Sequence, residues 1–248
     1  MALLEVCTDG YRDSLVAYEA GVKRIELCHG LDLGGLSPAP ATVRLLKQET
    51  DLLIIPILRC RPAGFSYDLL EKKQMWQEAL ALLEAGCDGL SFGFLNAEGD
   101  LDEATMKDFI QLVHEYHGQA VCHRAFDLTR AGEKSLESLI RLSCDRVLSS
   151  GRAKTAEEGI QNLARWQQQY GEAIEILAGG GISASNAAKI LKETGLHQIH
   201  ASCKSALEDP TTCRGALTFS ISREAGKAYY GTDPEKIRAL LRVIADQE

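Results

Sequence analysis

The feature that most constrains the fold is a regular alternation of short apolar runs with segments of helical periodicity along the whole chain. The apolar runs cover residues 3–7, 24–28, 52–60, 89–95, 119–127, 146–150, 174–180 and 198–203. Continuous apolar runs are typical of parallel strands that are buried on both faces. Eight such strands, each followed by a helix, close into a barrel. The sequence therefore predicts an α/β fold that consists of a single (β/α)8 TIM barrel.

The domain organisation follows from the length and from the last elements of the chain. A chain of 248 residues is long enough for one barrel, and no composition break or low-complexity linker divides it. We therefore expect one domain over residues 1–248. The last helix is expected at Asp233-Pro234, where an N-cap residue precedes a proline, so a long excursion at about 204–231 precedes it. Pro56 interrupts the third apolar run, which predicts a bulge or a later strand start there.

Charge and composition exclude several classes of partner. The formal net charge is −8 and the Lys and Arg residues form no cluster, so we expect no nucleic-acid partner that is bound through its phosphates. No apolar run approaches the roughly 18 residues of a membrane span, and the N-terminus lacks a signal-peptide pattern. The eight cysteines include no CxxC pair, so a disulfide framework or a structural zinc site is not expected. The sequence predicts a cytoplasmic protein without a membrane partner.

Polar side chains occur near the end of almost every apolar run. In a TIM barrel the C-terminal ends of the strands form one rim, and the ligand site lies there. Residues two apart in a strand share a face, so pairs of these side chains should point the same way. The residues expected at the rim are Glu5, Cys7, Glu26, Cys28, Arg59, Arg61, Ser91, His123, Asp127, Ser149, Gly179, Gly180, Gly181, His200 and Ser202.

The segment AVCHRAFD at 120–127 allows a more specific prediction. Strand parity places His123 toward the barrel interior and Asp127 above it, whereas Cys122 and Arg124 should face the helices or enter a loop. An alternative interpretation stays open at this point. Glu5, Glu26, Arg59 and Arg124 could instead form a structural ion network that only fills the barrel mouth.

Two kinds of binding site can be distinguished within the rim. Gly180 and Gly181, together with Ser202 after the eighth strand, resemble an anion cradle in which backbone N–H groups approach a phosphate. Cys7 and Cys28 end neighbouring strands, which lie about 4.8 Å apart. Two thiolates at that spacing could share one soft ion such as Cu(I).

Several short motifs occur in a fixed order along the chain: LLEVC, RIELC, GGLSP, HRAFD, SSG, AGGGI and HASC. In this order they resemble the copper homeostasis protein CutC family over about residues 1–205. The resemblance implies a cytosolic barrel protein that is associated with copper tolerance and forms a homo-oligomer. It also implies that Cu(I) binds at the positions of Cys7 and Cys28, as in some members of the family. One departure lies at 59–65, where the chain reads RCRPAGF and lacks the acidic residue of the family pattern.

Two functions are compatible with these residues. As a binding protein, the chain would hold Cu(I) through Cys7 and Cys28, with Glu5 and Glu26 beneath them as structural acids. As an enzyme of unknown reaction, it would act on a small phosphorylated or carboxylated metabolite. The residues expected to bind that metabolite are Glu5, Arg59, Arg61, Ser149, Gly180, Gly181, His200 and Ser202. The candidate catalytic residues are His123, Glu26 and Asp127, and His123 or Glu26 would move a proton.

Overall fold

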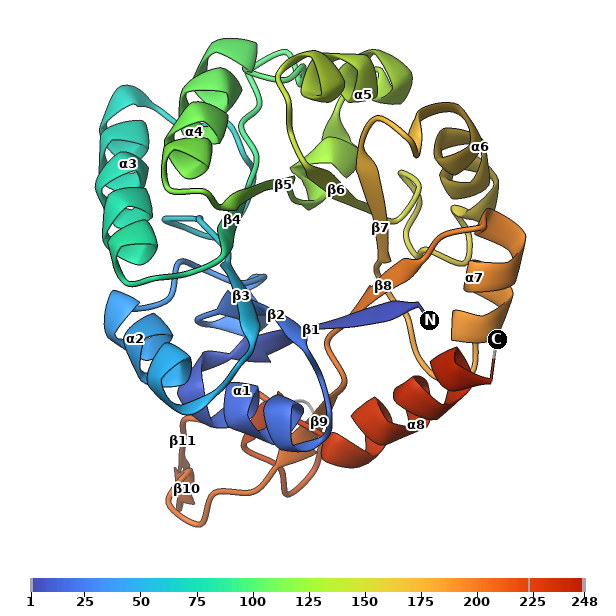
Figure 1. Ribbon diagram of the computed structural model, residues 1–248. Coiled ribbons are helices and arrows are strands. Elements are labelled where there is room, and N and C mark those ends of the chain that lie inside the picture. The colour runs from blue at the N-terminus through green and yellow to red at the C-terminus, as the bar shows by residue number, and fades with distance from the viewer. Residues whose placement is uncertain (1, 223, 247–248) are drawn as a thin grey trace.

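The computed structural model describes residues 2–222 and 224–246, in which eight parallel strands form a barrel enclosed by helices (Figure 1). The barrel strands are β1 (Leu3–Asp9), β2 (Arg24–Cys28), β3 (Leu53–Pro56), β4 (Gly89–Phe92), β5 (Gln119–Cys122), β6 (Arg146–Ser149), β7 (Glu175–Gly179) and β8 (Gln198–Ala201). The helices are α1 (Gly10–Glu19), α2 (Pro40–Glu49), α3 (Leu69–Glu84), α4 (Glu103–Glu115), α5 (Gly132–Arg141), α6 (Ile160–Tyr170), α7 (Ala187–Thr194) and α8 (Pro234–Ala245). The prediction of a TIM barrel is confirmed. None of these helices is both long and apolar enough for a membrane span within the described ranges.

The barrel closes between β3 and β4 with little regular pairing. The hydrogen-bonded order of the strands is β3-β2-β1-β8-β7-β6-β5-β4. An isolated bridge between Ile57 and Ser91 joins the two ends, and the Leu58 N–H donates to the Ser91 carbonyl at 2.8 Å. Pro56 is the last residue of β3, opposite Leu27. The predicted third strand was therefore too long, because the strand ends at the residue that lacks an N–H instead of starting after it.

The fifth strand also ends earlier than predicted. β5 stops at Cys122, and a 3-10 helix, η2 (Arg124–Leu128), follows directly. The His123 imidazole starts this helix, because its Nδ1 accepts a hydrogen bond from the Ala125 N–H at 3.1 Å. A side chain that binds local backbone in this way competes with continuation of the strand. The prediction of a strand up to Asp127 was wrong for this reason.

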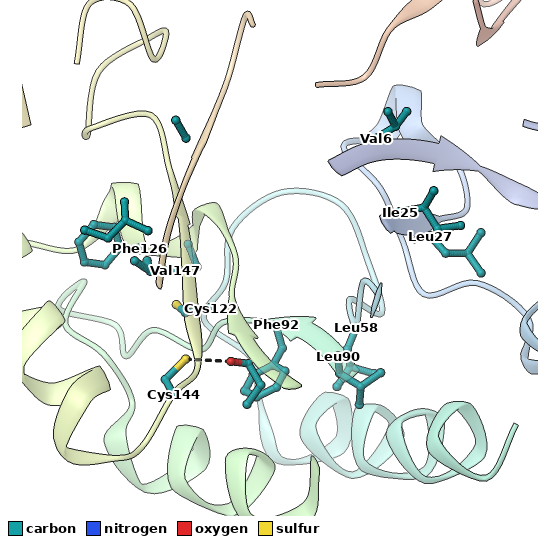
Figure 2. Close-up of a cluster of buried hydrophobic side chains, with 14 of the residues drawn as sticks. Val6, Ile25, Leu27, Leu58, Leu90, Phe92, Cys122, Phe126, Cys144 and Val147 are labelled. Atoms are coloured by element: carbon teal, nitrogen blue, oxygen red, sulfur yellow. Dashed lines mark hydrogen bonds between the residues drawn. The ribbon is translucent and has the colours of Figure 1, made fainter. Parts of the chain in front are cut away.

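Two separate apolar clusters lie on the two faces of the sheet. The large one packs between strands and helices and includes Val6, Phe92 and Cys122 (Figure 2). Within it, the Cys144 thiol donates to the Ala120 carbonyl at 3.3 Å (Figure 2). The small cluster lies on the inner face and consists of Cys7, Cys28 and Ile57, with Leu31 packed against it. Cys122 and Cys144 thus serve packing, whereas Cys7 and Cys28 belong to the barrel interior.

The excursion between β8 and α8 contains short antiparallel strands. β9 (Lys204–Leu207) pairs with β12 (Tyr229–Thr232), and β10 (Cys213–Arg214) pairs with β11 (Leu217–Thr218). The β10–β11 hairpin projects beyond the ring of helices near α1 (Figure 1). The excursion does not add to the barrel sheet, and it leaves the rim strands in their parallel order.

Asp233 caps α8, as the Asp-Pro pattern predicted. Its side chain accepts hydrogen bonds from the Glu235 and Lys236 N–H groups at 2.9 and 3.4 Å and from the Ser205 hydroxyl at 2.6 Å. We expect Asp233→Ala to lower the free energy of unfolding by about 1 kcal/mol, measured by urea denaturation. Asp246→Ala at the C-cap of α8 is the control, because a carboxylate there does not favour the helix dipole. Equal losses in both variants would contradict the capping role.

Candidate functional site

A cavity of about 260 Å³ opens among the C-terminal ends of the barrel strands. Its apolar wall includes Leu31, Ile57 and Phe65. Its other lining residues include Cys7, Glu26, Arg59, His123, Arg124, Gly180, Gly181, His200 and Ser202. All of this second group except Arg124 were expected at the rim, so the tertiary structure brings most of the predicted residues together. We call this cavity the rim pocket.

The two predicted thiols lie side by side, and Cys7 borders the rim pocket. The Sγ atoms of Cys7 and Cys28 are 3.4 Å apart, although β1 and β2 are staggered so that Cys7 pairs with Glu26 in the ladder. Cys28 is fully buried, because Gly35 lies close above it: a Cβ atom at Gly35 would come within 3.0 Å of the Cys28 sulfur. Only Cys7 of the pair lines the cavity.

Glu26 and His200 complete the polar group around Cys7. The Glu26 Oε2 atom lies 3.4 Å from the Cys7 sulfur and 3.8 Å from His200 Nε2. One donor atom from each of these three residues lies within 4.8 Å of the other two, a grouping that can hold a metal ion. The hydrogen bond with Cys28 and burial raise the pKa of Cys7, and burial raises the pKa of Glu26.

A buried ion pair supports this group from below. Glu5 Oε1 accepts a hydrogen bond from His200 Nδ1 (2.8 Å), and Glu5 Oε2 pairs with Arg24 Nε at 2.6 Å. Burial opposes ionisation of Glu5, but the His200 hydrogen bond and the Arg24 charge outweigh it and lower its pKa to about 2. Glu5 does not line the rim pocket. The ion network of the alternative interpretation therefore exists in part, with Arg24 as the partner of Glu5 in place of Arg59 or Arg124.

His123 faces the barrel interior, as strand parity predicted, and it is only 3% exposed. Its Nδ1 is occupied by the Ala125 N–H, so the proton of the neutral imidazole belongs on Nε2. Burial and the charge of Arg59 lower the pKa of His123 to about 3, which keeps the ring neutral. His123 therefore presents a hydrogen-bond donor to the pocket. The prediction that it acts as a base is not favoured by this arrangement.

Arg59 is buried in the wall of the rim pocket, with 6% of its surface exposed. Its Nη1 donates to the carbonyls of Gly34 and Gly35 at 3.0 and 3.1 Å, and its Nη2 donates to the Ala63 carbonyl at 2.6 Å. The guanidinium carbon also lies 5.1 Å from the centre of the Phe65 ring. These contacts hold the guanidinium in place, and no carboxylate of residues 2–222 and 224–246 forms an ion pair with it.

Besides Glu5 and Cys28, several other predicted rim residues lie outside the pocket, among them Arg61, Asp127 and Ser149. Arg61 pairs with Glu71. The prediction for Arg61 failed because it assumed strand parity beyond Pro56, where β3 ends. Asp127 accepts hydrogen bonds from the Ser149 hydroxyl at 2.5 Å and from the Ser150 N–H at 3.1 Å, so it stabilises the loop after β6 and does not lie above His123 as predicted. Ser149 is directed to Asp127 and not to the cavity.

Arg124 is a charged pocket residue that strand parity did not place at the rim. Strand parity placed it among the helices or in a loop, but η2 turns its side chain toward the cavity. Its Nε donates to Asp127 Oδ2 at 2.8 Å, and its Nη2 donates to the Ser150 hydroxyl at 2.7 Å. The spacing of Arg124 and Asp127, three residues apart, matches a helical turn and could have indicated this arrangement.

The fold and this site define a class: parallel TIM-barrel proteins with a thiol-containing pocket at the C-terminal rim. Residues 2–205 match the CutC family, and the chain belongs to that family. It is 40% identical over 209 residues to a family protein CutC of Treponema denticola, which covers 84% of each chain. It is 37% identical over 215 residues to a family protein CutC of Mesorhizobium japonicum, covering 86% of this chain and 81% of the relative.

Comparison with solved structures agrees with this family and this fold. A crystal structure of a protein from Streptococcus agalactiae, described provisionally as the copper homeostasis protein CutC, superposes with a TM-score of 0.76 and 28% identity. The match covers 82% of this chain and 99% of that one. Thiamine phosphate pyrophosphorylase from Pyrococcus furiosus matches with a TM-score of 0.60 and 15% identity over 99% of this chain and 96% of its own, which reflects the shared barrel fold.

Proposed function

We propose that this CutC family member takes part in copper homeostasis by binding Cu(I) through the thiolates of Cys7 and Cys28. The observation that carries the proposal is the 3.4 Å separation of the two sulfur atoms beside the rim pocket. Both sulfurs also lie near one further atom, Glu26 Oε2, at 3.4 and 3.9 Å, so one ion could contact both after a small movement of either side chain. The name of the Streptococcus agalactiae structure, which refers to copper homeostasis, supports the same function.

The donor atoms around this point suit Cu(I) better than a hard ion. Thiolate sulfur is a soft ligand that selects Cu(I), and imidazole nitrogen is a common further ligand. His200 lies close enough to Cys7 to supply that nitrogen. Glu26 is the only carboxylate in the lining of the rim pocket, so the oxygen-rich shell that Mg²⁺ or Ca²⁺ requires is missing there within the described residues.

The state of the cysteines supports a cytoplasmic location, which we include in the proposal. All eight cysteines are free thiols, including the adjacent pair Cys7 and Cys28. Free thiols persist in reducing compartments, where such a pair would remain available to a metal. The homo-oligomer implied by the family resemblance stays a prediction, and native mass spectrometry of the purified protein measures it directly.

Anaerobic titration of the reduced protein with Cu(I) tests the function. We expect one ion to bind per chain, with X-ray absorption spectra dominated by copper–sulfur scattering, because two thiolates supply the main ligands. Zn²⁺, titrated in the same way, is the comparison ion. Binding of less than a stoichiometric amount of Cu(I), or a spectrum dominated by nitrogen and oxygen ligands, would contradict the proposal.

A further inference from the structure

We propose that the rim pocket also binds a small oxyanion, the carboxylate or phosphate group of a metabolite, above the thiol pair. Its anionic group would lie between Arg59 and His123 on one side and the loop 180–182 on the other. This site does not depend on copper. It involves different atoms of the pocket, and the polar atoms that would form it have no partners among the described residues.

The first of these groups is the guanidinium of Arg59. Its contacts are to backbone carbonyls, and no Asp or Glu of the described residues lies within ion-pair distance of it. Its Nε is buried and has no hydrogen-bond partner in the described part of the chain. A buried charge without a counter-ion is costly, and a bound anion removes that cost. Arg59 also lines the cavity, so an anion can reach it from solvent.

The second group is the Nε2 atom of His123. It is buried and finds no partner among the described residues, while Nδ1 is satisfied by the Ala125 N–H. Buried polar atoms are almost always hydrogen-bonded, so an orphaned donor on a residue that lines a cavity indicates a partner supplied by a ligand or a water. Phe65 packs against both groups: its ring centroid lies 4.8 Å from that of His123 and 5.1 Å from the Arg59 guanidinium carbon. The two donors are therefore held on the same side of the pocket.

The opposite side of the pocket supplies backbone donors. Gly180 has a φ of +107°, and a Cβ atom there would lie 3.2 Å from Arg124 Nη1, so glycine lets the loop approach this guanidinium. No described residue accepts a hydrogen bond from the N–H of Gly181 or Ile182. Free backbone N–H groups in a glycine loop are a recurrent anion site.

The charge and size of the pocket restrict the ligand. Arg59 and Arg124 both line the cavity. Arg124 is paired with Asp127, whereas Arg59 has no carboxylate partner among the described residues, so Arg59 is the charge that an anionic ligand would neutralise. The volume of about 260 Å³ is below the range of typical drug-sized sites, roughly 300–1,000 Å³. A small organic acid or a small phosphate ester fits these limits.

Isothermal titration calorimetry and thermal unfolding of the metal-free protein test the proposal, with inorganic phosphate and succinate as probes and sodium chloride at matched ionic strength as the reference. We expect at least one oxyanion at millimolar concentration to raise the melting temperature, since a ligand of the native state stabilises it. An effect of phosphate alone identifies a phosphate ester as the ligand class, and an effect of succinate alone identifies a carboxylate. The absence of any shift with both probes would overturn the proposal.

Matched variants locate the site. Arg59→Met should weaken oxyanion binding by about tenfold or more, because it removes a charge-assisted contact. Arg61→Met makes the same change in charge two residues away, outside the pocket, and should leave affinity unchanged. His123→Phe keeps a ring against Phe65 but removes the Nε2–H, so it should weaken binding even if Arg59→Met fails to fold. Equal affinities in all three variants would overturn the assignment.

Two further measurements separate this site from the copper site. Cys28→Ser, at the thiol that does not line the cavity, should retain oxyanion binding, so a loss of Cu(I) binding and a loss of anion binding can be distinguished. In ¹⁵N spectra of the histidine side chains, the Nε2 resonance of His123 should shift when the bound oxyanion accepts its proton. An unchanged His123 resonance under saturating probe would place the anion elsewhere.

Discussion

Cys28→Ser is expected to abolish stoichiometric Cu(I) binding in anaerobic competition with a chromogenic chelator. The variant keeps the size of the side chain but replaces a soft sulfur with a hydroxyl, which is a poor ligand for Cu(I). Loss of groups that only support a metal ligand already costs about 10–100-fold in affinity, so loss of a ligand should cost at least about 100-fold. The 3.4 Å contact with Cys7 makes Cys28 half of the proposed pair.

Cys87→Ser is the matched control for that experiment. Cys87 is also a buried free thiol, but it precedes β4 and lies at the opposite end of the barrel from the rim. The control should therefore bind Cu(I) like the unaltered protein. If both variants bind equally well, the pair Cys7 and Cys28 is not the copper site. If both lose binding, the effect reflects a general loss of structure, which circular dichroism would detect.

Arg24→Met is expected to lower the free energy of unfolding by about 3–5 kcal/mol, measured from urea midpoints at pH 7. Arg24 is buried, and its Nε lies 2.6 Å from Glu5 Oε2. Methionine keeps most of the apolar stem but leaves the Glu5 carboxylate in the barrel interior without its guanidinium. Removing one partner of a buried ion pair is costly because the remaining charge is uncompensated.

Two comparisons make this prediction specific. Arg141→Met removes an exposed pair with Glu103 and should change stability by less than about 1 kcal/mol. The double variant Arg24→Met with Glu5→Gln removes both charges of the buried pair and should recover part of the loss. No recovery in the double variant would mean that the cost of Arg24→Met comes from lost packing and not from the unpaired carboxylate.

The sequence alone determined the barrel and the membership of most of the rim. Strands buried on both faces must be apolar along their length, so the alternation of apolar runs with helices indicated eight strands before any contact was known. Strand parity then placed Cys7, Glu26, His123 and His200 on the inner face, and the structure has them there. This part could be predicted because it depends on local periodicity alone.

The prediction failed where the ladder ends. β3 stops at Pro56, which has no N–H, and β5 stops before His123, whose ring binds the Ala125 N–H. Beyond these two strand ends, the alternation of side chains between the two faces of a strand no longer predicts where a side chain points. Arg61 was therefore wrongly placed at the rim, and Arg124 was wrongly left out of it. The position of a strand end depends on single hydrogen bonds, which periodicity does not contain.

Only the tertiary structure decided the chemistry of the site. The stagger of β1 and β2 determines that the sulfurs of Cys7 and Cys28 meet at 3.4 Å, and no spacing in the sequence specifies that distance. Within the described residues, Arg59 has no carboxylate partner and the Nε2–H of His123 has no acceptor. Both facts depend on which segments, distant in sequence, pack around these side chains. The sequence pattern determines which residues face the barrel interior. The hydrogen-bond partners of those residues, their protonation states and their unsatisfied donors depend on contacts between elements, so only the packed structure determines them.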